Sequence, residues 1–183
     1  MDAKRQAQHL WQQYLADGDP VAFRRLYDLT YDHLFRYAHR INRDAPAVRD
    51  ALQEVYLAIW QRRDRVPPVR EPWVFLLVSL RNRIIDEARR KRIVAVEHTP
   101  TVSPEEELLA EETEAMRSQW LGQQLDKLPE RQREALHLRY HLELEYSEVA
   151  DVLGVSQQVA YNYVNRGVKA LKKGVDARPE WFF

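Results

Sequence analysis

The sequence predicts an all-α protein made of two small helical domains that an acidic linker joins. Apolar residues recur every three or four positions through most of the 183 residues, which is the spacing of one helix face. Glycine is scarce, with five residues, and this disfavours sheet-rich folds with many tight turns. A segment rich in proline and glutamate separates the helical patterns into two groups, which favours a linker between two domains.

The first domain, residues 1–92, is expected to consist of helices alone. A short amphipathic helix over residues 3–16 is followed by a break, in which Asp19 is a good N-cap and Pro20 a good first helical residue. One apolar face then continues for about six turns to Ile41, at about 3.6 residues per turn. We interpret this stripe as core packing.

A second break is expected from Asn42 to Pro46, after which the pattern predicts a helix over residues 47–63. Three prolines then fall within residues 63–72. Because proline disrupts a helix interior, this segment is predicted to be an ordered loop. Pro72 suits the first turn of the following helix, where the N–H that it lacks would have no partner anyway.

The helix from Pro72 to Arg92 changes character along its length. Its first half carries one apolar face, made by Trp73, Leu76, Leu77, Leu80 and Ile84. Its second half carries the cations Arg81, Arg83, Arg89, Arg90, Lys91 and Arg92, with Asn82 and Asp86 among them. On its own, such a run is most simply a solvated helix end. The alternative is a helix that is anchored in a core at one end and offers cations to a polyanion at the other.

The net charge of zero conceals a strong polarity along the chain. Residues 1–95 hold 18 Lys/Arg against 12 Asp/Glu, a net of +6. Residues 96–130 hold 2 against 9, a net of −7, and residues 131–183 hold 8 against 7, a net of +1. A basic, an acidic and a nearly neutral segment therefore follow one another, which matters more for the choice of partners than the total.

The acidic linker is expected over residues 93–113, the second domain over residues 114–178, and an apolar tail over residues 179–183. Helical periodicity resumes in the second domain and predicts helices over residues 114–128 and 130–140, separated by a proline.

The most diagnostic segment of the second domain is a helix-turn-helix pattern. Ser147 is expected to cap a short helix over residues 148–153, which Gly154 ends by taking the left-handed conformation of a tight turn. Ser156 is expected to cap a second helix, and Ala150 is small where the two helices must approach. The expected buried stripe of the second helix is Val159, Val164, Val168 and Leu171. An ordinary helical hairpin is the alternative, but the coincidence of turn glycine and caps favours DNA binding.

The other face of the second helix carries amides, a tyrosine and cations, which are groups that reach base edges and phosphates. These candidate DNA-binding residues are Gln157, Gln158, Tyr161, Asn162, Asn165, Arg166 and Lys169.

The sequence offers little for catalysis, and we expect neither an enzyme nor a cofactor. The absence of cysteine removes disulfides, thiolate zinc sites and thiol catalysis, and it fits a reducing cytoplasm. No signal peptide and no apolar run long enough to span a bilayer is visible. His137 and His141 lie four residues apart, as in some metal hydrolases, but Leu138 stands where those enzymes carry a glutamate base. We therefore expect no metal site.

Taken together, the motifs resemble the extracytoplasmic-function group of the sigma-70 family, the initiation factors of bacterial RNA polymerase. Residues 19–92 resemble the family's region 2 and residues 117–173 its region 4. The region 2 pattern D-x-x-Q-E-V-(F/Y)-L-x-x-W appears here as DALQEVYLAIW over residues 50–60. The pattern of the next helix in the family is matched by Trp73, Asn82, Asp86, Arg89 and Arg90.

The resemblance implies a factor that directs RNA polymerase core to promoters and promotes DNA opening. It implies that Asp50, Gln53, Glu54 and Trp60 bind the core enzyme. The loop over residues 63–72 and Asn82 would hold flipped bases of the −10 element, and Asp86 would also belong to the residues that bind this element. The phosphates around the point where DNA melting starts would be bound by Arg81, Arg83, Arg89, Arg90 and Arg92. The second helix of the helix-turn-helix would read the −35 element, and the acidic linker would thread towards the active-site channel of the polymerase.

The implied partners are RNA polymerase core, through its clamp coiled coil and its flap, promoter DNA, and an anti-sigma factor, with no membrane insertion. One departure from the family concerns residues 159–163, where the sequence VAYNY replaces the common T-V-x-x-R. Another is Val48, which stands where the family commonly has an acidic residue. The main alternative is a dimeric helix-turn-helix regulator that binds duplex DNA without polymerase. A purely helical interaction module is a further alternative.

Overall fold

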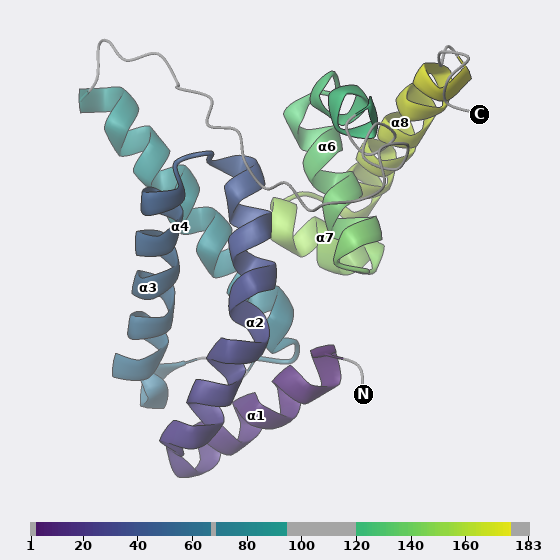
Figure 1. The fold of residues 1–183 in the computed structure, drawn as a ribbon. Helices are drawn as coiled ribbons and strands as arrows, with labels where there is room; N and C mark the ends of the chain where they lie inside the picture. Colours follow the sequence, from purple (N-terminus) through teal and green to yellow (C-terminus); the bar gives the residue numbers. More distant parts are fainter. Residues whose placement is uncertain (1–2, 67–68, 95–119, 177–183) are drawn as a thin grey trace, which may run out of the picture. The chain divides into compact units, whose positions relative to one another are not determined.

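A computed structural model describes residues 3–66, 69–94 and 120–176, and these ranges fold as helices joined by turns (Figure 1). The chain divides into two compact units, Met1–Val102 and Ser103–Phe183. The all-α, two-domain prediction is therefore confirmed. Of the linker predicted over residues 93–113, the structure describes only residues 93 and 94, and these are helical. The apolar tail lies outside the described residues, as does the start of the helix predicted over residues 114–128.

The helices of the first unit are α1 (Ala3–Asp17), α2 (Pro20–Ile41), α3 (Ala45–Gln61) and α4 (Pro72–Val94), with a 3-10 turn, η1 (Arg63–Arg65), after α3 (Figure 1). The helix α1 packs on α2 and α4, and α3 packs on both α2 and α4. This arrangement places the polar sides of α3 and α4 next to one another, where the candidate residues of the first domain lie.

The helix starts follow from side-chain caps. The carboxylate of Asp19 accepts a hydrogen bond from the Val21 N–H at 2.8 Å, as predicted. The expected break from Asn42 to Pro46 is too long, because the Asp44 carboxylate accepts from the Ala47 N–H at 3.1 Å and starts α3 at Ala45. A proline is tolerated in that first turn, where its missing N–H has no partner to lose.

The core of the first unit is apolar and aromatic. The predicted α4 stripe of Trp73, Leu76, Leu77, Leu80 and Ile84 is buried throughout. One buried polar link joins α2 to α3: the Thr30 hydroxyl donates to the Leu26 carbonyl at 2.7 Å and lies 2.6 Å from the Tyr56 hydroxyl. Because the hydroxyl hydrogen of Thr30 is already used, Tyr56 is the donor of the second bond.

The second unit begins, in its described part, with helical residues 120–126. It continues with α6 (Glu130–Leu136), a π-helical turn η2 (His137–His141), α7 (Tyr146–Leu153) and α8 (Gln157–Asp176) (Figure 1). The α-helix predicted over residues 130–140 is therefore interrupted. Its last part widens to a π-turn, in which the Leu142 N–H donates to the His137 carbonyl at 3.1 Å.

The turn between α7 and α8 has the predicted geometry. Gly154 takes the left-handed conformation, with φ 66° and ψ 42°, and the Ser156 hydroxyl accepts from the Val159 N–H at 3.4 Å. The predicted cap of the first helix is wrong: α7 starts two residues before the expected position, after Glu145 rather than Ser147. There the Glu148 carboxylate accepts from the Glu145 N–H at 2.7 Å.

The predicted stripe of α8 is only partly buried. Val164 is buried, whereas Val159, Val168 and Leu171 are half-buried. Ala160 and Gly167 complete the buried face of this helix. Small residues at these two positions allow α8 to lie close to its neighbours, and α8 packs on both α6 and α7.

Candidate nucleic-acid interface

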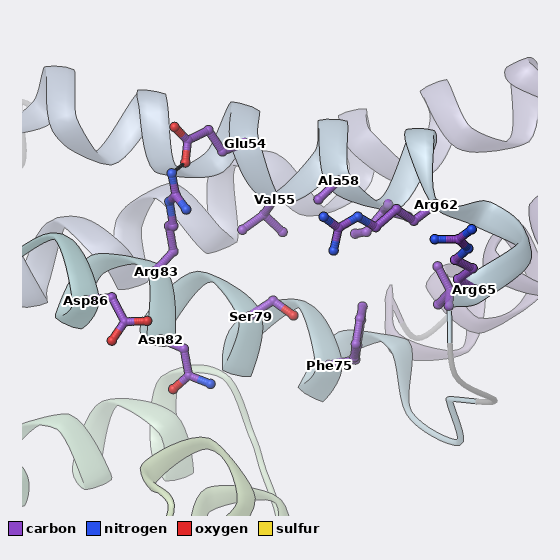
Figure 2. A pocket seen from close by; sticks show the side chains of 12 residues that line it. Glu54, Val55, Ala58, Arg62, Arg65, Phe75, Ser79, Asn82, Arg83 and Asp86 are labelled. Carbon is purple, nitrogen blue, oxygen red and sulfur yellow. Dashed lines mark ion pairs between the residues drawn. The ribbon is translucent and has the colours of Figure 1, made fainter.

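A groove of about 420 Å³ lies between α3 and α4 (Figure 2). Its apolar wall includes Val55, Ala58 and Phe75. Its polar lining is Glu54, Arg62, Arg65, Ser79, Asn82, Arg83 and Asp86. An apolar wall with polar groups around it suits a planar ring that carries hydrogen-bonding edges.

Helical spacing explains why these side chains meet. On α4, the lining residues Phe75, Ser79, Asn82 and Asp86 recur every three or four positions. They therefore share one side of the helix, distinct from the buried stripe that Leu77 belongs to. The helical spacing of residues along α4 therefore defines both its buried face and the face that lines the groove.

The charges in the groove are unevenly placed. Arg62 and Arg65 lie towards the end of α3, whereas Glu54, Arg83 and Asp86 lie at the other end (Figure 2). Glu54 and Arg83 form an ion pair that joins α3 to α4, with 49% and 42% of their side chains exposed. The pair connects two residues to which the resemblance assigns different partners, the core enzyme for Glu54 and DNA for Arg83.

The predicted phosphate-binding cations of α4 do not all face solvent. Arg83, Arg89 and Arg90 are exposed, but Arg81 is only 6% exposed. The expectation that Arg81 offers a surface cation is therefore wrong. Position 81 lies four residues after Leu77, so it falls on the buried face of the helix. Arg92 lies within α4, and its side chain is outside the described part.

The candidate polymerase-binding residues share one face of α3. Asp50, Gln53 and Glu54 are exposed, and Trp60 is 46% exposed. Leu57 lies between them on the same face and is 53% exposed. Our list of candidate residues omits Leu57, although a leucine on the polar side of an amphipathic helix is the signal that identifies it.

Trp60 is held in place by other aromatic rings. It stacks on Tyr14, with ring centroids 5.9 Å apart and an interplanar angle of 17°. It also contacts Phe23, with centroids 5.2 Å apart. The Tyr14 hydroxyl donates to the Ile59 carbonyl at 3.3 Å. Trp60 therefore presents a half-exposed ring whose orientation α1 and α2 fix.

The predicted reading face of α8 is on the surface. Exposed side chains are Gln157, Gln158, Tyr161, Asn162, Arg166 and Lys169. The Gln158 amide donates to the Asn162 side-chain oxygen at 3.3 Å. Asn165 differs, because it is half-buried and its amide donates to the Tyr161 carbonyl at 3.0 Å. That bond uses one of its donors locally.

Two residues that sequence reasoning missed support the reading face. The Tyr146 ring packs edge-on against Tyr161, with centroids 5.3 Å apart and an interplanar angle of 65°. The Arg139 guanidinium lies 5.1 Å from the Tyr146 ring centroid. These residues come from η2, α7 and α8, so no spacing within one helix could reveal the contact.

The described residues give no sign of a metal centre, since no group of three or more His, Asp or Glu among them could hold an ion. His137 and His141 stack on one another, with ring centroids 4.6 Å apart. No helix in the described ranges has the length and apolarity needed to cross a bilayer. The arrangement offers amides, cations and exposed aromatic rings, which are binding groups rather than a catalytic set.

Two models of one protein family match the chain. The model for sigma-70 region 2 matches residues 26–93, and the model for sigma-70 region 4 matches residues 118–171. Together they cover more than half of the chain. The first match contains α4 and the groove, and the second contains the helix-turn-helix, so each model covers one of the two candidate interfaces.

Curated relatives and solved structures agree with these matches. The chain is 27% identical over 166 residues to the ECF RNA polymerase sigma factor SigK of Mycolicibacterium vanbaalenii, covering 87% of this chain and 84% of the relative. It is 28% identical over 162 residues to SigL of Mycobacterium tuberculosis, covering 86% of this chain and 90% of the relative.

Among solved structures, CnrH in complex with the cytosolic domain of CnrY superposes with a TM-score of 0.64 at 23% identity, covering 97% of this chain and all of that one. The sigma factor RpoE in complex with the anti-sigma factor NepR from Bartonella quintana also gives a TM-score of 0.64, at 19% identity, covering 86% of this chain and 98% of that one. These likenesses support the fold. The family matches favour a sigma factor over a dimeric regulator, and the chain belongs to the sigma-70 family, in its extracytoplasmic-function group.

Proposed function

We propose that the two units of this sigma factor, which directs RNA polymerase core to promoters, divide the promoter between them. The first unit binds core through α3 and holds the −10 element beside α4, and the second unit reads the −35 element through α8. The observation that carries this proposal is the groove between α3 and α4, which combines an apolar wall with amide and guanidinium groups.

The groove fits one unstacked base of the opened strand. Phe75 and Val55 supply apolar surface for the ring, and Ser79 and Asn82 supply hydrogen-bonding groups for its edge. Arg62 and Arg65 stand at one end, where they can meet the phosphates of the same strand. Exposed Arg89 and Arg90 supply further cations on the last turns of α4, beyond the opposite end of the groove.

The exposed face of α3 binds the clamp coiled coil of the core enzyme. Asp50 and Gln53 supply hydrogen-bond acceptors, and the half-exposed Leu57 and Trp60 supply apolar area. A mixed surface of this kind suits a protein partner that offers arginines, since carboxylates pair well with guanidinium groups. Glu54 belongs to this face as well, although Arg83 already occupies its carboxylate in the free protein.

The second unit places α8 in the major groove at the −35 element. Its amides suit base edges, and Arg166 and Lys169 suit phosphates. The second unit is also the proposed contact of the polymerase flap. Because the polymerase and the chromosome share the bacterial cytoplasm, the protein acts there, and it binds and opens DNA without catalysing a reaction of its own.

We also propose an anti-sigma partner. RpoE of Bartonella quintana, a protein of this fold, is solved in complex with the anti-sigma factor NepR. CnrH, another protein of this fold, is solved in complex with the cytosolic domain of CnrY. The half-exposed apolar residues Leu57 and Trp60 are the part of the first unit best suited to bind one.

Fluorescence of 2-aminopurine tests the groove. The probe replaces single bases of the −10 non-template strand in a promoter complex with core and the full chain, and it brightens when a base leaves the stack. We expect one position to brighten with the wild type, and Asn82→Ala and Arg62→Ala to reduce that signal. The matched control Arg24→Ala removes an exposed cation of α2 that is paired with Asp28 and should change nothing.

An unchanged signal in both groove variants, with complexes still forming, would show that the flipped base is held elsewhere.

A further inference from the structure

Tyr161 is an exposed aromatic residue that core packing does not explain. Its side chain is 45% exposed, whereas its neighbours Ala160 and Val164 make the buried face of α8. It lies in the first half of α8, the part of a recognition helix that meets base edges. An aromatic ring at that position offers a reading surface of a different kind from the amides around it.

We propose that Tyr161 reads a thymine methyl group in the −35 element, and that Tyr146, supported by Arg139, is the positioning residue that fixes the Tyr161 ring. This inference rests on the proposed function, in which α8 enters the major groove at the −35 element. It assigns a role to two residues outside α8.

The contacts join side chains from three elements, η2, α7 and α8. The Tyr161 and Tyr146 rings meet edge-on at 5.3 Å, a favoured geometry for two aromatic rings. The Arg139 guanidinium lies over the Tyr146 ring, 5.1 Å from its centroid. Arg139 is itself anchored, because its guanidinium donates to the Leu144 carbonyl at 2.9 Å and lies 3.9 Å from the Glu145 carboxylate.

Anchoring matters because an isolated surface tyrosine samples several rotamers. The contact with Tyr146 restricts the Tyr161 ring before DNA binds, so that less side-chain conformational entropy is lost on binding. The π-turn η2 contributes here, since Arg139 lies within it. The irregular turn is thus part of what places Arg139 against Tyr146.

The neighbouring side chains favour thymine as the target. Gln158 and Asn162 lie on the same exposed face and hydrogen-bond to each other at 3.3 Å. Side-chain amides pair with the adenine edge, and the thymine of an A·T pair presents a methyl group in the same groove. An apolar ring beside two amides therefore matches the two halves of an A·T pair.

The test uses the full chain with RNA polymerase core and the −35 sequence that this holoenzyme selects from a randomised library. Each thymine of that sequence is replaced in turn by deoxyuridine, which removes only the methyl group. We expect about fourfold weaker binding by the wild type at one position, the loss expected for one apolar carbon. Tyr161→Ala should not distinguish thymine from deoxyuridine there, whereas Tyr161→Phe should.

Tyr146 is tested by the same difference rather than by affinity alone. Tyr146→Leu should reduce the discrimination between thymine and deoxyuridine, and Tyr146→Phe should restore it, because the edge contact needs the ring and not the hydroxyl. Circular dichroism verifies that each variant is folded.

The outcomes separate the inference from the function on which it rests. If the wild-type holoenzyme selects a −35 sequence but no deoxyuridine weakens binding, or if Tyr161→Ala keeps the penalty, the thymine assignment is wrong. If Tyr161→Phe behaves like Tyr161→Ala, the hydroxyl makes the contact instead. Full discrimination by Tyr146→Leu would refute the positioning role. Failure of the wild-type protein to form a holoenzyme that prefers any −35 sequence would overturn the proposed function itself.

Discussion

The approach of α8 to α6 at Gly167 makes a quantitative prediction. A methyl group at this position would lie 2.8 Å from Cδ1 and 3.0 Å from Cγ of Leu136, whose side chain is buried in α6. Alanine in place of glycine in a helix normally stabilises by about 0.8–1.0 kcal/mol. Overpacking a filled core costs about 1–3 kcal/mol. Gly167→Ala should therefore range from neutral to about 2 kcal/mol destabilising.

Gly122 provides a matched control in the same unit. It also lies in a helix, residues 120–126, but no atom lies within 4 Å of a methyl group placed there. Gly122→Ala should therefore show only the gain in helix propensity, of up to about 1 kcal/mol. The two variants have the same chemistry and should differ by about 1–3 kcal/mol.

Hydrogen–deuterium exchange of the full chain measures the effect within the second unit. We expect the α6 and α8 amides to exchange faster in Gly167→Ala than in Gly122→Ala, in which exchange should be unchanged or slower than in the wild type. The amides of the first unit serve as an internal reference, because neither substitution touches them. Equal protection in the two variants would refute the claim that α8 needs a glycine to approach α6.

Three further predictions concern the first unit. Replacing both Arg89 and Arg90 with alanine should flatten the salt dependence of promoter binding by about two units in the slope of log K against log [salt], as for two lost phosphate contacts; an unchanged slope would exclude both residues. Gln53→Ala should weaken binding to core in a titration of labelled protein while the melting temperature stays the same, because the side chain is exposed; equal affinity would remove it from the interface. Burial raises the pKa of the Tyr56 hydroxyl above its ordinary value. The unfolded chain therefore loses this proton first as the pH rises, and stability should fall above a pH of about 10, more steeply in the wild type than in Tyr56→Phe, as urea unfolding at pH 9 and 11 would show.

Local signals in the sequence predict most of the helices. Asp19 and Gly154 illustrate why, because a cap or a left-handed turn depends on one residue and its immediate neighbours. The buried stripe of α4 was equally readable, since helical spacing defines its face without knowledge of any partner. In the first unit, the sequence therefore predicts every α-helix, but it places both ends of α3 and the end of α4 two residues away from where they lie.

Other features are predicted less well. Ser147 is predicted to start α7, although a capping box between Glu145 and Glu148, which is also a local signal, starts the helix two residues earlier. No residue of the π-turn η2 forbids an α-helix, so the sequence carries no local signal for it. Arg81 is a different case. Its charge favours the surface, whereas its spacing from Leu77 places it on the apolar face of α4.

The candidate site was predicted in part. The sequence identified the exposed faces of α3, α4 and α8 but not the ion pair between Glu54 and Arg83, which joins residues 29 positions apart. It also missed the edge-on contact of Tyr146 with Tyr161, which joins α7 to α8. Both contacts depend on how two helices pack against each other, and the periodicity of a single helix does not predict such packing.

The central claim is that the two units bind two promoter elements, and do so only as part of the polymerase holoenzyme. The most direct test is transcription by purified RNA polymerase core on a library of promoter fragments, with and without this chain. The account predicts new transcripts from a defined set of fragments that share two conserved elements, and their loss when either the α4 arginines or the α8 amides are replaced. Core that starts the same transcripts whether or not the chain is present would contradict it.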